Sequence, residues 1–244
     1  MRPAYKDEQD IVDHASEIDV SDVCFYPAES DVAHRFLASI RGGGLVKRER
    51  PDFEDPAASL LLEAMVVDDH PRPGRKDRTR ARESEVLRDL EAAGFDLRPD
   101  VKVVAAVSSG LPTEQDHNYT GYIDHFARTV LKHARKVDAY RAERPGYELG
   151  FLVFDESTAY FETLGSFGQD GKGRPHLWFA DTAFTDVMVQ SGADCFVWLT
   201  PYKRLLTTPT ETIALPAMTI IDVMMLRQAE RHAYDARRMI SAEE

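Results

Sequence analysis

The chain has 244 residues, of which 43% are hydrophobic and 30% are charged, and its formal net charge is −12 at pH 7. These values predict a soluble globular protein that buries its own core. No apolar run at the N-terminus resembles a signal peptide and no apolar stretch is long enough to span a bilayer, so we expect no membrane partner. The two cysteines, Cys24 and Cys195, are isolated, which favours a reducing, cytoplasmic setting over a disulfide framework.

In chain order, residues 1–26 are polar and acid-rich and are expected to form an N-terminal extension. Residues 27–244 are expected to form a single α/β domain. The first element of that domain is a helix within 27–40, because apolar residues recur there at helical spacing and a run of glycines follows. A charged strand over 45–50 then leads into a hairpin.

This hairpin carries two acids. Asp52 ends the first arm, a turn lies around Asp55 and Pro56, and Glu63 lies inside the apolar second arm, Leu60–Val67. An unpaired carboxylate in a hydrophobic sheet is costly. Two acids on adjacent strands therefore suggest a divalent cation held by oxygen ligands. The alternative is that Glu63 faces solvent at a sheet edge.

The rest of the chain alternates strands with helices. This alternation predicts an α/β fold with a mixed central sheet flanked by helices. The expected strands are 101–107, 149–154, 176–179 and 195–199, and the expected helices are the second half of 72–88, 123–134, 181–189 and 220–238.

The order helix, strand, Pro-Asp, turn, strand with an embedded Glu, and helix resembles the PD-(D/E)XK nuclease superfamily over residues 27–107. In that resemblance Asp52 is the Asp after Pro, Glu63 begins the E-x-K element, and Met65 stands where the family has a lysine. The resemblance implies a restriction-endonuclease-like core with phosphodiesterase activity on DNA. Nucleases of this fold often dimerise, so a homodimer is a candidate assembly, and the 220–238 helix is either its interface or ordinary core.

The same resemblance assigns further roles. Asp52 and Glu63 would hold Mg²⁺ or Mn²⁺, the backbone carbonyl of Ala64 would add an oxygen, and Glu29 matches the position of a further acidic ligand. The ion would neutralise phosphate charge and make a nucleophile from water, and a basic residue would stabilise the transition state. The candidates to replace the missing lysine are Lys76, Arg80 and Arg82.

These three residues belong to the basic run at 72–88. As a surface that faces phosphates, the run would make binding to nucleic acid salt-dependent. The alternative is a solvated helix face whose arginines pair with Glu83 and Glu85. The net charge of −12 argues against adhesion to nucleic acid through the whole surface.

A second dense polar group is the stretch 116–119, Asp-His-Asn-Tyr. Asp116 or Asn118 can serve as a helix cap. The functional alternative places His117 and Tyr119 at the mouth of the same cleft as Glu63. There they would contact substrate, or His117 would assist proton transfer. Together with Phe151–Ser157, this stretch also resembles proteins of phages and mobile elements.

The strand that ends in Asp155 and Glu156 resembles a Walker B strand, but the chain has no G-x-x-x-x-G-K-[ST] segment, which excludes a P-loop ATPase. These two acids are expected to cap the strand end or to pair with a basic neighbour. The histidines show no zinc spacing.

The sequence thus predicts a Mg²⁺-dependent, DNA endonuclease-like hydrolase. The alternative, favoured by Met65 and the acidic surface, is a catalytically inactive nuclease-fold module for binding or assembly. A basic side chain within reach of the pair Asp52 and Glu63 would favour catalysis, and apolar side chains plugging the pair would favour the module.

Overall fold

A computed structural model describes residues 7–69, 117–163, 173–201, 203, 205–207 and 212–242 of the chain. The expected helix in 72–88 and the expected strand at 101–107 lie outside the described residues. So do Lys76, Arg80 and Arg82.

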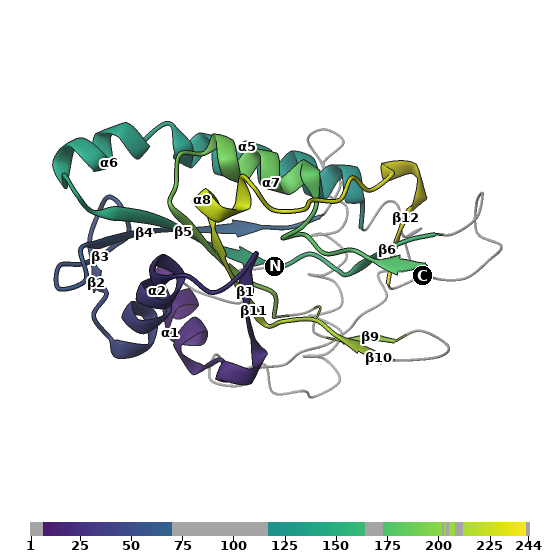
Figure 1. The fold of residues 1–244 in the computed structure, drawn as a ribbon, viewed down its shortest axis with the longest axis horizontal. Helices are drawn as coiled ribbons and strands as arrows, with labels where there is room; N and C mark the ends of the chain where they lie inside the picture. The colour runs from purple at the N-terminus through teal and green to yellow at the C-terminus, as the bar shows by residue number, and fades with distance from the viewer. Residues whose placement is uncertain are drawn as a thin grey trace, which may run out of the picture.

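Among the described residues, a seven-stranded mixed sheet forms the centre of the fold, with the order β1-β11-β8-β5-β4-β3-β2 (Figure 1). Strands β4, β5 and β8 run parallel to one another, and β2, β3 and β4 form an antiparallel meander. Strand β11 is antiparallel to β8 and parallel to β1. The strands are β1 Val23–Tyr26, β2 Val46–Lys47, β3 Phe53–Asp55, β4 Leu60–Val67, β5 Glu148–Asp155, β8 Cys195–Leu199 and β11 Met218–Asp222.

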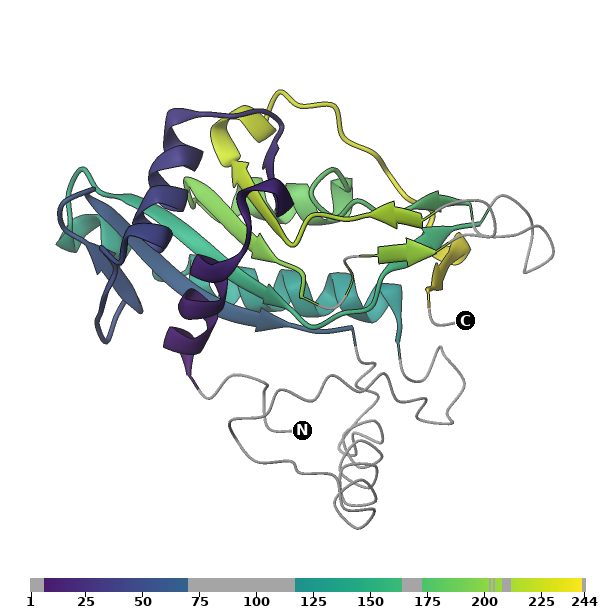
Figure 2. The same cartoon turned by 90° about the horizontal axis from the view of Figure 1, so that it is seen from below.

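Helices cover both faces of this sheet, as Figures 1 and 2 show from two directions. One face carries α1 Glu8–Glu17 and α2 Asp31–Gly42. The other carries α5 Tyr119–Ala134, α6 Val137–Glu143, α7 Thr182–Gln190 and α8 Val223–Leu226. Two small sheets lie beside this core, β12-β6-β7 and β10-β9. Their strands are β6 Tyr160–Glu162, β7 Arg174–Pro175, β9 Leu205–Thr207, β10 Thr212–Ala214 and β12 Met239–Ser241, and the short 3-10 helices are η1 Val20–Asp22 and η2 Ala236–Arg238.

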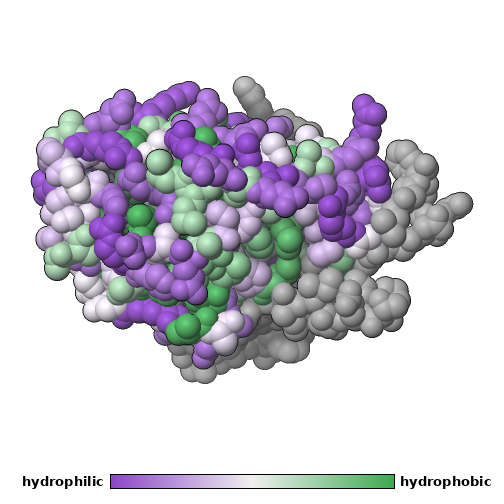
Figure 3. All heavy atoms as spheres, viewed as in Figure 1, coloured by the Kyte–Doolittle hydropathy of each residue, from purple (hydrophilic) through white to green (hydrophobic). Residues whose placement is uncertain are grey.

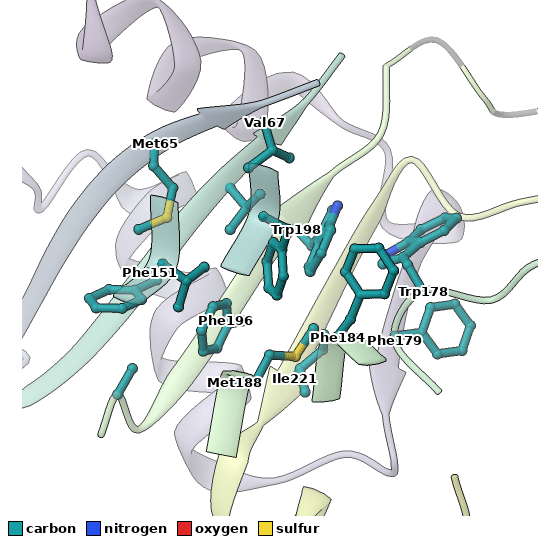
Figure 4. Packing of buried hydrophobic residues seen from close by; sticks show 14 of the residues in the cluster. Met65, Val67, Phe151, Trp178, Phe179, Phe184, Met188, Phe196, Trp198 and Ile221 are labelled. Carbon is teal, nitrogen blue, oxygen red and sulfur yellow. The ribbon is translucent and has the colours of Figure 1, made fainter. Parts of the chain in front are cut away.

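The alternation of side chains along β4 explains why the sheet is covered twice. Met65 and its same-face neighbours pack under α5 and α7, in the aromatic-rich cluster of Figure 4. Leu62 and its same-face neighbours pack under α1 and α2. Strands that are apolar on both faces are typical of buried parallel sheets. Phe36 of α2 packs closely against Gly150 of β5 on this face. A Cβ added at Gly150 would stand 2.4 Å from the ring of Phe36. The outer surface seen in Figure 3 is largely hydrophilic.

Residues 8–26, expected as an extension, contribute a helix and an edge strand to this fold. Ile11, Val12 and Ala15 form the buried face of α1, and β1 pairs with β11. The few apolar residues of the segment lie on one side of a helix, which is enough to attach it to the core.

Several expected elements are confirmed. The helix within 27–40 is α2, the hairpin is β3 and β4, and the helix from 123 is α5. Asp181 is the N-cap of α7, where its side chain accepts a hydrogen bond from the Ala183 amide. The strands at 149–154 and 195–199 are β5 and β8.

Two expectations at the C-terminal end of the chain are wrong. Residues 176–179 form no strand; the strand lies earlier, at β7, and is followed by a turn. The predicted helix 220–238 is instead the end of β11, the short α8, and an extended path through η2 to β12. Pairing with β8 overrides the helical pattern, since Ile220 and Ile221 complete a fully buried strand. Because this long helix is not formed, it does not provide the dimer interface suggested from the sequence.

No helix in the described part of the chain is long and apolar enough to cross a membrane.

Candidate functional site

The hairpin brings Asp52 and Glu63 together. Its register pairs Phe53 with Leu62, so one further step along the ladder sets Asp52 opposite Glu63. The Ala64 amide donates a hydrogen bond to Asp52 Oδ2 at 2.7 Å, which fixes that carboxylate beside β4. Because opposite residues of an antiparallel pair share a face, both acids lie on the face that α5 and α6 cover.

Glu63 is 2% exposed and is surrounded by three donors from the junction between α5 and α6. His133 Nδ1 lies 2.6 Å and Lys136 Nζ 2.7 Å from Oε1, and the Tyr140 hydroxyl donates to Oε2 at 2.8 Å. Steps of three and four residues bring these side chains to one side of the helical path. The sheet and the helix junction thus build one polar site around a buried carboxylate.

The two carboxyl groups of the site have opposite pKa shifts. Burial alone would raise the pKa of Glu63, but the hydrogen bonds from His133, Lys136 and Tyr140 outweigh burial and lower this pKa to about 2. Burial and the nearby charge of Glu63 raise the pKa of Asp52 to about 6, although the Ala64 amide opposes this shift. Pairs of acids whose environments separate their pKa values are frequent in active sites.

A pocket of about 460 Å³ is lined by Arg48, Glu49, Arg50 and Glu143, and Arg50 links it to the site through its charge. Burial and the hydrogen bond to Glu63 raise the pKa of Tyr140, and the positive charge of Arg50 opposes that rise. Arg50 therefore lies within electrostatic range of the site.

Of the other residues expected here, Glu29 is not brought to the pair. It precedes α2, on the opposite face of the sheet, where its 72% exposed side chain lies 3.1 Å from His34. Met65 is buried in the core on the Glu63 face. Among the described residues, the basic side chains that reach Glu63 are His133 and Lys136. Neither stands out in the sequence, because the positive residues around them look like an ordinary solvated helix face.

His117 lies at the other end of β4. Its Nδ1 is 3.0 Å from Oδ1 of Asp69, a fully buried carboxylate. Asp69 also accepts hydrogen bonds from the Tyr160 hydroxyl at 2.5 Å and the Thr158 amide at 3.1 Å. Asp69 lies six positions after Glu63 and two residues beyond the end of β4, a path of about 20 Å at extended spacing. His117 therefore does not share a cleft with Glu63.

A third polar group lies at the carboxyl end of β5. Lys203 Nζ is 2.6 Å from Asp155 Oδ2 and donates to Ser157 Oγ at 2.7 Å and to the Tyr122 hydroxyl at 3.0 Å. Trp198 Nε1 donates to the same Asp155 oxygen at 2.9 Å. Burial lowers the pKa of Lys203, and the negative charge of Asp155 opposes that shift. The expectation that Asp155 pairs with a basic neighbour is confirmed.

These polar groups at the ends of β4 and β5 lie where ligands bind in many open α/β sheets, outside the carboxyl ends of parallel strands. Within the described residues, no group of three or more His, Cys, Asp or Glu side chains is arranged to hold a metal ion. Comparisons with protein-family models, curated proteins and solved structures found no match for this chain.

Proposed function

We propose that this protein is a metal-dependent phosphodiester hydrolase that acts on nucleic acid, in the first place DNA, with a restriction-endonuclease-like core around the β3–β4 hairpin. Asp52 and Glu63 are the proposed ligands of Mg²⁺ or Mn²⁺. The observation that carries the proposal is the 2.7 Å contact between Lys136 Nζ and Glu63 Oε1. Lys136 thereby takes the role that the sequence offered to residues of the basic run at 72–88.

The carboxylates of Asp52 and Glu63 fit a divalent cation, and Asp52 is the better suited of the two. Asp52 has the raised pKa of a half-buried carboxylate beside a like charge, and a cation there would relieve both effects. Glu63 already accepts hydrogen bonds from His133, Lys136 and Tyr140. A carboxylate has about four lone-pair sites, so one remains for a metal.

The residues of the site divide the work of phosphodiester cleavage. A bound Mg²⁺ would neutralise negative charge at the phosphate and lower the pKa of a bound water. Lys136 would donate to a phosphate oxygen as negative charge develops there. Asp52 becomes fully ionised only above a pH of about 6, so its capacity to bind a cation rises with pH through that value.

One observation favours the second candidate, a catalytically inactive module for binding or assembly. All three donors around Glu63 come from the protein itself, and together they hold the pKa of this acid at about 2 without any ion. A site that is complete in this way can serve to join α5 and α6 to the sheet. The two candidates differ in whether Asp52 and Glu63 bind a cation.

The decisive experiment is calorimetric titration of Mg²⁺ and Mn²⁺ into the full chain at pH 8 and at pH 5. Asp52→Asn and Glu63→Gln are expected to weaken binding at least tenfold, and the wild type is expected to bind more tightly at pH 8. The matched control is Glu54→Gln. Glu54 lies two residues from Asp52 on the same strand face but is paired with Arg48 and Arg144. Folded wild-type protein that binds neither ion would overturn the hydrolase proposal in favour of the module.

If a metal binds, cleavage of plasmid DNA tests the basic residue. Lys136→Met is expected to slow cleavage by about 10²–10³, the usual cost of losing one electrostatic stabiliser of a transition state. Lys132→Met, one turn earlier on α5, is the control and should leave the rate unchanged. Equal rates for the two variants would remove Lys136 from the mechanism.

A further inference from the structure

A short loop from Arg48 to Asp52 leads into the hairpin that carries the candidate site. The amide of Arg48 donates a hydrogen bond to the carbonyl of Asp52 at 2.8 Å, which closes the loop and leaves Arg50 at its middle. The carboxylate of Asp52 accepts a hydrogen bond from the amide of Ala64 at 2.7 Å. The loop is thus closed on itself and tied to β4, and it holds the backbone of Arg50 beside the site.

The two arginines of this loop differ in their partners. Arg48 lies 2.6 Å from Glu54 and also contacts Glu143, so its positive charge is compensated. Arg50 is exposed, and in the part of the chain that the structure describes it forms no ion pair with a carboxylate. A guanidinium without a carboxylate partner is available to an anionic ligand, which it can hold through two parallel hydrogen bonds.

Arg50 lies close to the two acids of the site. Two residues along the chain separate its Cα from that of Asp52, a span of at most about 7 Å. Burial raises the pKa of the Tyr140 hydroxyl, the positive charge of Arg50 opposes that rise, and the same hydroxyl donates to Glu63 at 2.8 Å. A group bound by Arg50 is therefore a neighbour of the place where the proposed metal ion would lie.

A pocket gives such a group room beside the site. Arg50 lines the pocket of about 460 Å³ described above. Pockets that hold small molecules have volumes of about 300–1,000 Å³, so a nucleotide-sized part of a larger ligand fits here. Glu49 also lines this pocket and is exposed, and its negative charge would repel an anionic ligand. Arg50 and Glu49 therefore act on such a ligand with opposite signs.

We propose that Arg50 binds the phosphate adjacent to the scissile one in a nucleic acid strand and thereby sets the position of the strand over Asp52 and Glu63. The inference rests on the proposed hydrolase function, which makes a nucleic acid strand the ligand. It adds a substrate-binding residue that belongs neither to the proposed metal ligands nor to the basic run at 72–88.

The first test measures how tightly the full chain binds a fluorescent DNA duplex as the salt concentration rises. Ca²⁺, which also prefers oxygen ligands, replaces Mg²⁺, and a gel confirms that the DNA stays intact. One phosphate contact contributes about 0.9 to the slope of log K against log salt. Arg50→Gln is expected to lower the slope by this amount and to weaken binding about five- to tenfold at 0.1 M salt. A change that only loosens the fold would not lower the slope.

Three further variants sharpen this test. Arg50→Lys should keep the slope and lose a few-fold in affinity, because an ammonium group cannot form the two parallel hydrogen bonds. Glu49→Gln should strengthen binding, since it removes a like charge from the pocket. The control is Arg35→Gln, which removes the same charge from α2 on the opposite face of the sheet, where the side chain is 44% exposed. This control should leave the slope unchanged.

The second test locates the contact on the strand. The ligands are a dinucleotide with its one internal phosphate and the same dinucleotide with an added 5′- or 3′-phosphate, titrated calorimetrically in Ca²⁺. The wild type should bind one of the two phosphorylated forms about fivefold more tightly than the parent dinucleotide. Arg50→Gln should lose this gain and bind the parent dinucleotide as the wild type does.

Failure of this inference is distinguishable from failure of the hydrolase proposal. If the wild type binds DNA but Arg50→Gln keeps both the slope and the gain from the added phosphate, Arg50 is not the contact, and metal titration and plasmid cleavage decide the hydrolase separately. A wild type that binds no DNA overturns the inference. Hexaglutamate that displaces DNA as well as the phosphorylated dinucleotide does, at equal ionic strength, would make the ligand an acidic peptide and overturn it too. A gain lost in Arg50→Gln, in a protein that cleaves no plasmid, would keep the phosphate contact and remove the hydrolase.

Discussion

Glu63 and Asp155 are buried carboxylates on the neighbouring strands β4 and β5, and each meets a lysine at almost the same distance. Lys136 Nζ lies 2.7 Å from Glu63, and Lys203 Nζ lies 2.6 Å from Asp155. The lysines differ in exposure, with 38% of the Lys136 side chain reached by solvent and 2% of Lys203. A lysine that solvent reaches can exchange its carboxylate for another anion, whereas an enclosed one cannot. We infer that the first pair is suited to chemistry and the second to holding the ends of the strands together.

The largest expected effect tests the enclosed pair. Lys203→Met leaves the buried Asp155 without its cation, and we expect it to lower the free energy of unfolding by about 3–5 kcal/mol. Urea denaturation at pH 7 measures this loss. Lys136→Met is the comparison and should cost about 1 kcal/mol or less, because Glu63 keeps His133 and Tyr140 and the lysine is partly solvated. Equal losses in the two variants would contradict the distinction between the pairs.

The second prediction concerns the contribution of Glu63 to stability at low pH. The pKa of Glu63 is about 2 in the folded protein and near 4.5 when unfolded, so its contribution to stability is present above pH 4.5 and is lost as the pH falls toward 2. The full contribution is on the order of 3 kcal/mol. Glu63→Gln should therefore be much less stable than the wild type at pH 7, and the difference should narrow between pH 4.5 and pH 2. Denaturation curves across this range measure it, and a difference that is independent of pH would contradict the assigned pKa.

The third prediction concerns Asp52, whose ionisation has the opposite effect on stability from that of Glu63. The folded pKa of Asp52 is about 6 against 3.8 for the free group, so the ionised carboxylate opposes folding above pH 6 and this penalty disappears as the pH falls from 6 toward 4. Asp52→Asn should raise the melting temperature at pH 8 by about 2 °C, the size of a solvent-screened charge effect. At pH 4 the variant and the wild type should melt together. A variant that melts below the wild type at pH 8 would show that Asp52 stabilises the fold.

The smallest expected effect comes from an ion pair in which neither partner is buried. Arg231 contacts Asp186 where the two side chains are 29% and 62% exposed. Arg231→Gln should change the free energy of unfolding by less than about 0.5 kcal/mol, and less again in 0.5 M salt. Measured beside Lys203→Met, this variant extends the series from enclosed to open ion pairs. A loss of unfolding free energy above about 1 kcal/mol would mean that solvent exposure does not determine how much these ion pairs stabilise the fold.

The sequence was informative where a local pattern decides the structure. A first arm that ends in Asp52, a turn around Asp55 and Pro56, and the apolar run Leu60–Val67 predicted the β3–β4 hairpin. The hairpin alone brings Asp52 to Glu63. The apolar period of α5 and the Asp181 cap of α7 were equally local. In each of these elements the residues that determine the structure lie within about twelve positions of one another.

The partners of the buried carboxylates could not be predicted in the same way. Lys136 and Tyr140 look like a solvated helix face until α5 and α6 are laid on β4, because only tertiary packing places them over Glu63. Lys203 has no pattern around it, and its partner Asp155 is 48 residues away. The C-terminal helix was wrongly predicted for the same reason, since the pairing of Ile220 with Val197 is not a local property of either segment.

The position of β1 at the edge of the sheet has a consequence for synthesis of the chain. Val23 pairs with Met218, so 218 − 23 = 195 residues of sequence separate the two strands of this ladder. At the usual speed of a ribosome, β1 would wait roughly 10–40 s for its partner. During that interval α1 can already pack on α2 and β4, but β1 has no strand to pair with. Strand β1 is thus made early but is among the last to join the sheet. Until β11 is synthesised, the unpaired backbone of β1 must be kept from pairing with other strands.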